Sequence, residues 1–145
     1  MLRQVALSLS VVLATPIASL AQEGECMAEF ALVKGTGEFT ALKLFQFGSH
    51  YELQADTPAQ GPLDTFAASL DGTPADLHFS LGLDDLLVVM STHESDLEVS
   101  SQFLGKLAKG KTITVTANAA GKAAFSEFSL KGSAAAIKRL QANCK

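Results

Sequence analysis

Turn-forming residues cut the chain beyond residue 25 into short segments, which sets narrow limits on its fold. Residues 56–62 read Asp-Thr-Pro-Ala-Gln-Gly-Pro and residues 71–74 read Asp-Gly-Thr-Pro. These residue types favour turns because they fix or tolerate turn dihedrals. The segments between them are short, and they either alternate apolar and polar residues or are apolar throughout, which is typical of strands. The chain is therefore predicted to be mainly β: an antiparallel β-sandwich or a curled sheet with one or two short helices, including a C-terminal helix.

Five strands are expected between residues 26 and 90, and two of them, residues 65–70 and 77–83, lie on either side of the turn at residues 71–74. Residues 26–34 and 38–47 are predicted to be strands joined by a hairpin turn at Gly35–Gly37. The second of these carries apolar residues on both faces, which predicts a central strand covered on both sides. Residues 86–90 are apolar throughout, which fits a buried strand or part of a helix that starts at Asp84 and Asp85. The two adjacent valines favour the strand.

The last third is predicted to contain a hairpin between two helices. Residues 112–117 alternate Thr with Ile, Val and Ala, a turn is expected at residues 118–121, and the segment after it alternates again. A short helix before the hairpin is expected to be capped by Ser101 and ended by Gly110. The closing helix is expected to be capped by Ser133.

Residues 1–21 have the pattern of a cleaved secretory signal peptide. Arg3 precedes an acid-free apolar run, and small residues stand at Ser19 and Ala21, the two positions that a signal peptidase reads. The run is shorter than the roughly 20 residues that a membrane-spanning helix needs. We expect cleavage to leave residues 22–145 as a single β-rich domain, periplasmic or secreted and not membrane-spanning.

The two cysteines, Cys26 and Cys144, lie near the two ends of this expected domain. In an oxidising compartment a single pair of cysteines can form a disulfide. Ile137, Leu140 and Cys144 are spaced so that they share one face of the closing helix, which turns the thiol toward the apolar side. A Cys26–Cys144 disulfide that closes nearly the whole domain is therefore predicted.

Charge is distributed unevenly along the chain. Between Leu44 and Gly105 there are ten acidic residues and no Lys or Arg, whereas from Lys106 to Lys145 there are eight basic residues and one acid, Glu127. The acidic middle and the basic end either neutralise each other in the fold or leave an acidic face for a cationic partner. The basic end lacks interleaved aromatic residues and the chain is expected to be exported, so nucleic acid is not expected as a partner.

The C-terminal part resembles a known family. An expected helix is followed by Lys109-Gly110-Lys111, a Thr-rich strand and a Gly turn, and then by Phe-Ser-Leu-Lys-Gly-Ser-Ala-Ala-Ala-Ile at residues 128–137 and by Leu140. This order is similar to the end of the invasion-associated locus B family of small exported proteins. The resemblance implies an exported β-rich domain associated with the cell envelope or with host interaction, and it brings no catalytic residues with it.

No arrangement of catalytic residues emerges from the spacing. The chain has no Gly-x-Ser-x-Gly motif, and no spacing ties a serine to one of the three histidines. A sugar cleft normally has stacking aromatic residues, but the chain has one Tyr and no Trp. We therefore expect a protein that is not an enzyme and uses no cofactor.

Residues 93–96, His-Glu-Ser-Asp, place three potential metal ligands together. No pair among the His and acidic residues has the spacing of a known zinc motif. The favoured interpretation is a polar loop, in which His93 is a weak candidate for a metal ligand.

Two classes of function remain. The first is a non-enzymatic interaction protein of the periplasm or envelope whose acidic face engages a cationic envelope or host protein, for instance a lytic enzyme, with binding that weakens in salt. The alternative is a small apolar ligand or lipid-binding protein that uses the interior between the sheets. The residues expected to form the acidic face are Asp84, Asp85, Glu94, Asp96 and Glu98.

Overall fold

The structure is a computed structural model, and it describes residues 26–58, 62–82, 86–94 and 96–144. The expected signal peptide, residues 1–21, lies outside these ranges. The strands are β1 (Met27–Phe30), β2 (Leu32–Gly35), β3 (Ala41–Phe47), β4 (His50–Asp56), β5 (Leu63–Leu70), β6 (Thr73–Ala75), β7 (His78–Gly82), β8 (Leu87–Ser91), β9 (Thr112–Ala119) and β10 (Lys122–Ser129). The helices are α1 (Ser101–Lys109) and α2 (Ser133–Asn143). Within the described ranges, neither helix combines the length and the apolar character needed to span a bilayer.

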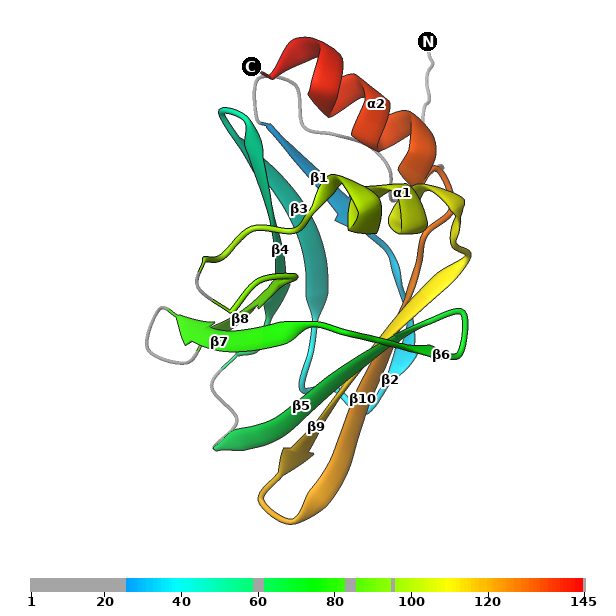
Figure 1. Cartoon of the computed structure of the whole chain (residues 1–145). Helices are drawn as coiled ribbons and strands as arrows, with labels where there is room; N and C mark the ends of the chain where they lie inside the picture. The colour runs from blue at the N-terminus through cyan, green and yellow to red at the C-terminus, as the bar shows by residue number, and fades with distance from the viewer. Residues whose placement is uncertain (1–25, 59–61, 83–85, 95, 145) are drawn as a thin grey trace, which may run out of the picture.

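The strands form two antiparallel five-stranded sheets, which confirms the predicted fold class. Sheet A has the strand order β1-β3-β4-β8-β7, and sheet B has the order β2-β10-β9-β5-β6. Buried residues of both sheets belong to one hydrophobic core. Both helices lie together over one end of the sheets (Figure 1).

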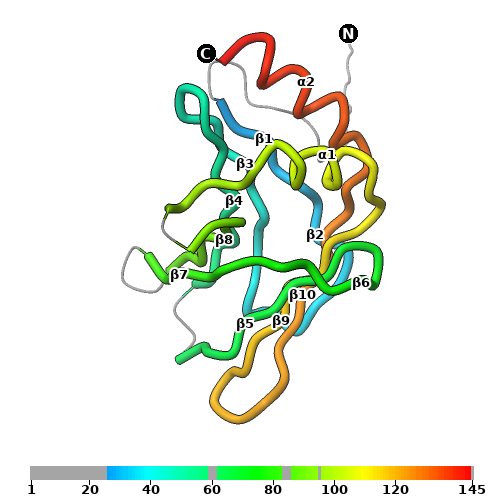
Figure 2. Tube along the Cα trace, in the orientation of Figure 1, coloured from blue at the N-terminus to red at the C-terminus, as the bar shows by residue number. Residues whose placement is uncertain are grey.

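At both edges of the sandwich the chain passes from one sheet to the other. β1 pairs with β3 in sheet A, and the chain continues past Ala31 into β2, which pairs with β10 in sheet B (Figure 2). On the opposite edge, β6 ends sheet B and the next strand, β7, ends sheet A. The single strand expected at residues 26–34 is therefore two strands. The hairpin expected at Gly35–Gly37 is wrong, because β2 and β3 belong to different sheets.

β3 buries one face rather than the two that were predicted. Leu42 and Leu44 are fully buried, whereas Phe47 is 47% exposed and Phe45 is half-buried on the opposite face. The rings of these two phenylalanines stack with their centroids 5.8 Å apart. Their apolar surface is thus covered in part by each other instead of by a second layer.

β9 and β10 form the predicted hairpin, and β8 confirms the strand expected at residues 86–90. The register pairs Ala119 with Lys122, so the turn consists of Ala120 and Gly121. Both turn residues have positive φ angles, 51° and 88°, as a type I′ turn requires.

α1 begins one residue earlier than expected. The N-cap is Ser100 instead of Ser101, and its Oγ accepts a hydrogen bond from the Phe103 backbone N–H at 3.2 Å. The predicted end at Gly110 is confirmed, and the glycine N–H donates to the Lys106 carbonyl at 2.9 Å.

α2 begins without a side-chain cap. The residue before it, Gly132, has a left-handed conformation with φ 84°. Ser133 was expected to cap this helix, but it is buried as the first helical residue and its hydroxyl donates to the Leu107 carbonyl at 2.6 Å. The hydroxyl therefore joins the start of α2 to the last turn of α1.

Cys26 and Cys144 form the predicted disulfide, with their Cα atoms 5.7 Å apart and a sequence separation of 118. The buried Gln46 side chain donates to the carbonyls of Gly48 and Cys144. The end of α2 is thus held to the start of β1 by a covalent bond and to β3 by a hydrogen bond.

Candidate functional site

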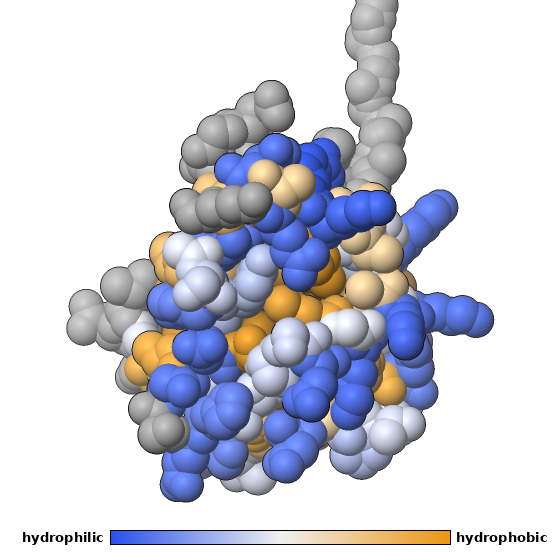
Figure 3. Space-filling view, turned by 45° about the horizontal axis from the view of Figure 1, so that its top comes forward, coloured by the Kyte–Doolittle hydropathy of each residue, from blue (hydrophilic) through white to orange (hydrophobic). Residues whose placement is uncertain are grey.

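A cavity of about 380 Å³ lies between the β5–β6 hairpin and α1. Its size falls in the range of small-molecule sites, about 300–1,000 Å³. On the face seen in Figure 3, hydrophobic side chains gather in a hollow near the centre and hydrophilic side chains surround it. The cavity is lined by Leu70, Thr73, Pro74, Ala75, Asp76, Thr92, Ser100, Gln102, Phe103 and Lys106.

The apolar part of the lining comes from the hairpin and the helix. Leu70 and Ala75 lie on β5 and β6 and are half-buried. Phe103 lies on the buried face of α1 and is 6% exposed. Pro74 lies on β6, the edge strand of sheet B, where a missing N–H is tolerated. Together these side chains offer an apolar wall to a ligand.

The polar part of the lining contains hydroxyl, amide and charged groups. Thr73 and Gln102 are exposed, and Asp76 and Lys106 are an exposed acid and an exposed base. Such groups fix the orientation of a ligand whose apolar part is held by the rest of the site.

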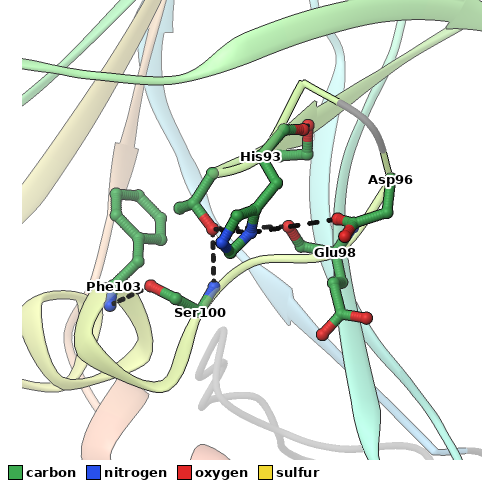
Figure 4. A network of polar contacts seen from close by, with 7 residues as sticks. His93, Asp96, Glu98, Ser100 and Phe103 are labelled. Carbon is green, nitrogen blue, oxygen red and sulfur yellow. Dashed lines mark hydrogen bonds and ion pairs between the residues drawn. The ribbon is translucent and has the colours of Figure 1, made fainter.

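Thr92 connects this cavity to the loop before α1. Its Oγ1 accepts a hydrogen bond from the Ser100 backbone N–H at 2.8 Å, and its backbone N–H donates to the Glu98 carbonyl at 3.1 Å. Ser100 in turn caps α1 (Figure 4). The first turn of α1 is therefore held in place through Thr92.

Three residues of the predicted acidic face share the loop at residues 93–98, which we call the acidic loop. Glu94 and Asp96 are exposed, and Glu98 is half-buried. The Oδ1 atom of Asp96 accepts a hydrogen bond from the Glu98 backbone N–H at 3.2 Å and lies 3.9 Å from Nδ1 of His93. The Glu98 carboxylate points away from the His93–Asp96 pair (Figure 4). The three carboxylates therefore share a loop without converging on one point.

Asp84 and Asp85, the other residues of the predicted acidic face, lie outside the described residues. Next to this segment, the Leu86 N–H donates to the Gly82 carbonyl at 3.1 Å. The five residues of β8 and Thr92 then separate Leu86 from the acidic loop, and five residues of extended strand alone span about 17 Å. One acidic face that includes all five residues stays a prediction.

Two histidines stand beside a carboxylate. Nε2 of His50 lies 3.6 Å from Oε2 of Glu52, and His93 lies beside Asp96 as described. In the part of the chain that the structure describes, no three His, Cys, Asp or Glu side chains gather as metal ligands do.

Asp71 and Tyr51 have shifted pKa values near the helical end. Hydrogen bonds from the backbone N–H groups of Thr112 and Lys111, both 2.9 Å long, lower the pKa of Asp71. Burial raises the pKa of the Tyr51 hydroxyl, which a hydrogen bond with Gln141 lowers in part. These contacts tie the β5–β6 turn to β9 and tie β4 to α2.

The cavity residues were not predicted from the sequence. Thr73, Asp76, Gln102 and Lys106 belong to no motif, and they meet because β6 folds back on β5 beside α1. Phe103 lies within the short helix expected between Ser101 and Gly110, and this large apolar side chain was the one available sign that something packs there.

No protein-family model, curated protein or solved structure matches this chain. The resemblance to the invasion-associated locus B family therefore stays a prediction from the C-terminal motif. The function is inferred below from the geometry of the cavity and the distribution of charge.

Proposed function

We propose that the protein is not an enzyme and binds a small amphipathic molecule in the cavity between the β5–β6 hairpin and α1. The observation that supports this is the ligand-sized volume with an apolar wall and polar groups around it. The apolar part of the ligand would contact Leu70, Ala75 and Phe103. From the sequence, the expected place for a small apolar ligand was the interior between the sheets. Leu and Phe side chains fill the core there, so we propose a site beside α1 instead.

The anionic dye 8-anilinonaphthalene-1-sulfonate is a suitable probe, because it combines aromatic rings with one charged group. We expect saturable fluorescence enhancement with one site per chain. Ala75→Phe fills the cavity and should weaken dye binding at least about tenfold, because it removes most of the apolar contact. The matched control, Ala67→Phe, adds the same ring at an exposed position of β5 outside the cavity and should leave binding unchanged. Equal dye binding by both folded variants would refute the proposal.

Charge variants then define the polar part of the ligand. Lys106→Gln should weaken binding of the sulfonate, whereas Asp76→Asn should leave it unchanged or strengthen it. If instead Asp76→Asn weakened dye binding and Lys106→Gln did not, the site would prefer a cationic ligand. Native mass spectrometry of the purified protein tests the same cavity for a natural ligand.

A second proposal is that the acidic loop binds a cationic protein of the envelope or host. It is supported by the exposure of Glu94, Asp96 and Leu97 on one short loop. The test is capture of lysozyme, as a cationic lytic enzyme, by the immobilised protein at low salt. Replacing Glu94 and Glu98 by Lys should abolish capture, and the charge-matched control with Lys at Glu29 and Glu38 should retain it. Equal loss in both variants would indicate a net-charge effect and refute a loop site.

We also propose that the protein works in the periplasm or outside the cell. The disulfide supports this location, because disulfides persist in oxidising compartments. The test is cell fractionation combined with intact mass measurement, which should find the exported chain starting at Gln22. A full-length chain in the cytoplasm with free thiols would refute it.

A further inference from the structure

We infer that the end of the molecule formed by α1, α2 and their adjoining turns docks on an anionic lipid surface. Residues 101–111 and 130–144 contain six basic residues and no Asp or Glu. The other described residues contain eleven acidic residues and three lysines. The helical end is therefore positive while the sheets are negative, so the fold keeps apart the charges that are separated in the sequence.

Four exposed lysines gather where the end of α1 meets the start of α2. Lys106 and Lys109 are three residues apart in α1 and so lie on the same side of the helix. The carbonyl of Lys111 accepts a hydrogen bond from the Leu130 backbone N–H at 2.8 Å, which places Lys111 opposite the residue that precedes Lys131. We call this group the lysine cluster: Lys106, Lys109, Lys111 and Lys131.

The backbone around the lysine cluster is fixed. The buried Ser133 hydroxyl holds the start of α2 to the Leu107 carbonyl of α1 at 2.6 Å. Two carboxylates lie near the cluster: Asp71 accepts hydrogen bonds from the backbone N–H groups of Lys111 and Thr112, each at 2.9 Å, and Asp76 lines the cavity together with Lys106. Four lysines and two carboxylates leave a net charge of about +2 on a preformed surface.

A lipid surface fits this arrangement through its shape and its charge. The lysine cluster extends from the end of α1 to the turn before α2, and of its four members only Lys106 lines the cavity. The exposed face of α2 next to it carries Lys138 together with the small residues Ala134 and Ala135, so this helix can approach a flat surface closely. Each lysine near an anionic bilayer strengthens binding by about fivefold. Several lysines on one end would therefore orient the protein with its acidic sheets away from the lipid.

The test is sedimentation of the oxidised protein from Gln22 to Lys145, which contains every described strand and helix, with lipid vesicles. Vesicles of phosphatidylcholine with about 30% phosphatidylglycerol should bind it at low salt with half-binding on the order of a millimolar lipid. Pure phosphatidylcholine should not bind it, and about 0.5 M salt should release it.

The matched variants locate the surface. Replacing Lys109 and Lys131 by Gln should weaken binding by about 30-fold, because two lysines are removed from the contact. Replacing Lys34 and Lys122, exposed lysines of sheet B, by Gln makes the same change in net charge and should leave binding within about twofold. Lys106→Gln with Lys111→Gln provides a second cluster variant if the first does not fold by circular dichroism.

Three results would overturn the inference. The first is no binding of the unmodified protein to anionic vesicles at low salt. The second is equal loss of binding in the cluster variant and the sheet B variant, which would assign the effect to net charge. The third is undiminished binding at high salt or to pure phosphatidylcholine, which would indicate insertion of apolar groups.

Discussion

The Cys26–Cys144 disulfide should supply a large part of the stability of the fold. Reduction of the native protein removes a cross-link between residues 118 apart in sequence and changes no side-chain packing except at the two sulfur atoms. The chain-entropy relation for a loop of this length gives about 4.9 kcal/mol at 25 °C. For a folded segment of this size, that free energy corresponds to a fall in Tm of about 20 °C.

Urea unfolding of the oxidised and reduced protein, followed by circular dichroism, measures this difference. The disulfide acts mainly by restricting the unfolded chain, so the oxidised protein should also show a smaller m-value. The variant with Ser in place of both cysteines should behave like the reduced protein. It serves as the control for incomplete reduction.

The reasoning fails if reduction lowers the free energy of unfolding by less than about 2 kcal/mol. In that case the ends of the unfolded chain would already stay close together without the disulfide. An unchanged m-value with a large loss of stability would be a different failure. It would move the effect from the unfolded chain to native contacts.

Three further changes test the packing and the electrostatics. The pKa of Asp71 is lowered in the fold, so its stabilisation is present above the unfolded-state value of 3.8 and is lost as the pH falls through the lower folded-state pKa. Asp71→Asn should therefore lower the free energy of unfolding at neutral pH. In urea unfolding below pH 3.8, the difference between this variant and the unmodified protein should shrink. A difference that stays constant with pH would contradict the lowered pKa of Asp71. Ser126→Ala removes the buried hydroxyl that donates to the Phe39 carbonyl at 2.9 Å. Calorimetry should find that the free energy of unfolding falls by about 1–3 kcal/mol. An unchanged free energy would mean that the carbonyl finds another donor. Gly35→Ala would place a Cβ 2.6 Å from the Ser126 Oγ and 2.7 Å from the Phe125 carbonyl oxygen, which should lower the free energy of unfolding by about 1–3 kcal/mol. Combining it with Ser126→Ala should not restore stability, because the close contact with the Phe125 carbonyl remains.

The fold class was predictable because local patterns encode it. In β9 and β10 the period of two and the turn residues agree, so strand, turn and buried face follow directly from the sequence. The strand predictions were wrong where pairing between segments far apart in the sequence determines the structure. Nothing in residues 26–35 tells which sheet a strand joins, and the pattern of β3 does not show whether a second layer covers Phe45 and Phe47.

The candidate sites were predictable to different degrees. The disulfide followed from the presence of two cysteines, and the lysine cluster came from a basic segment whose grouping in space depends on the contact between α1 and α2. The cavity was not predictable, because its lining joins three separate stretches of chain around residues 70–76, 92 and 100–106. Such a site exists only after the β5–β6 hairpin and α1 have packed, and no local spacing of residues in the sequence predicts that packing.

The passage of the chain between sheets at both edges determines how the molecule opens. β1 and β2 are continuous with each other across one edge, and β6 and β7 across the other. Opening either sheet therefore strains the strand that continues into its neighbour, so partial unfolding of one layer is suppressed. The amide protons at the centres of both sheets should then exchange with solvent through the same rare event, as one cooperative unit.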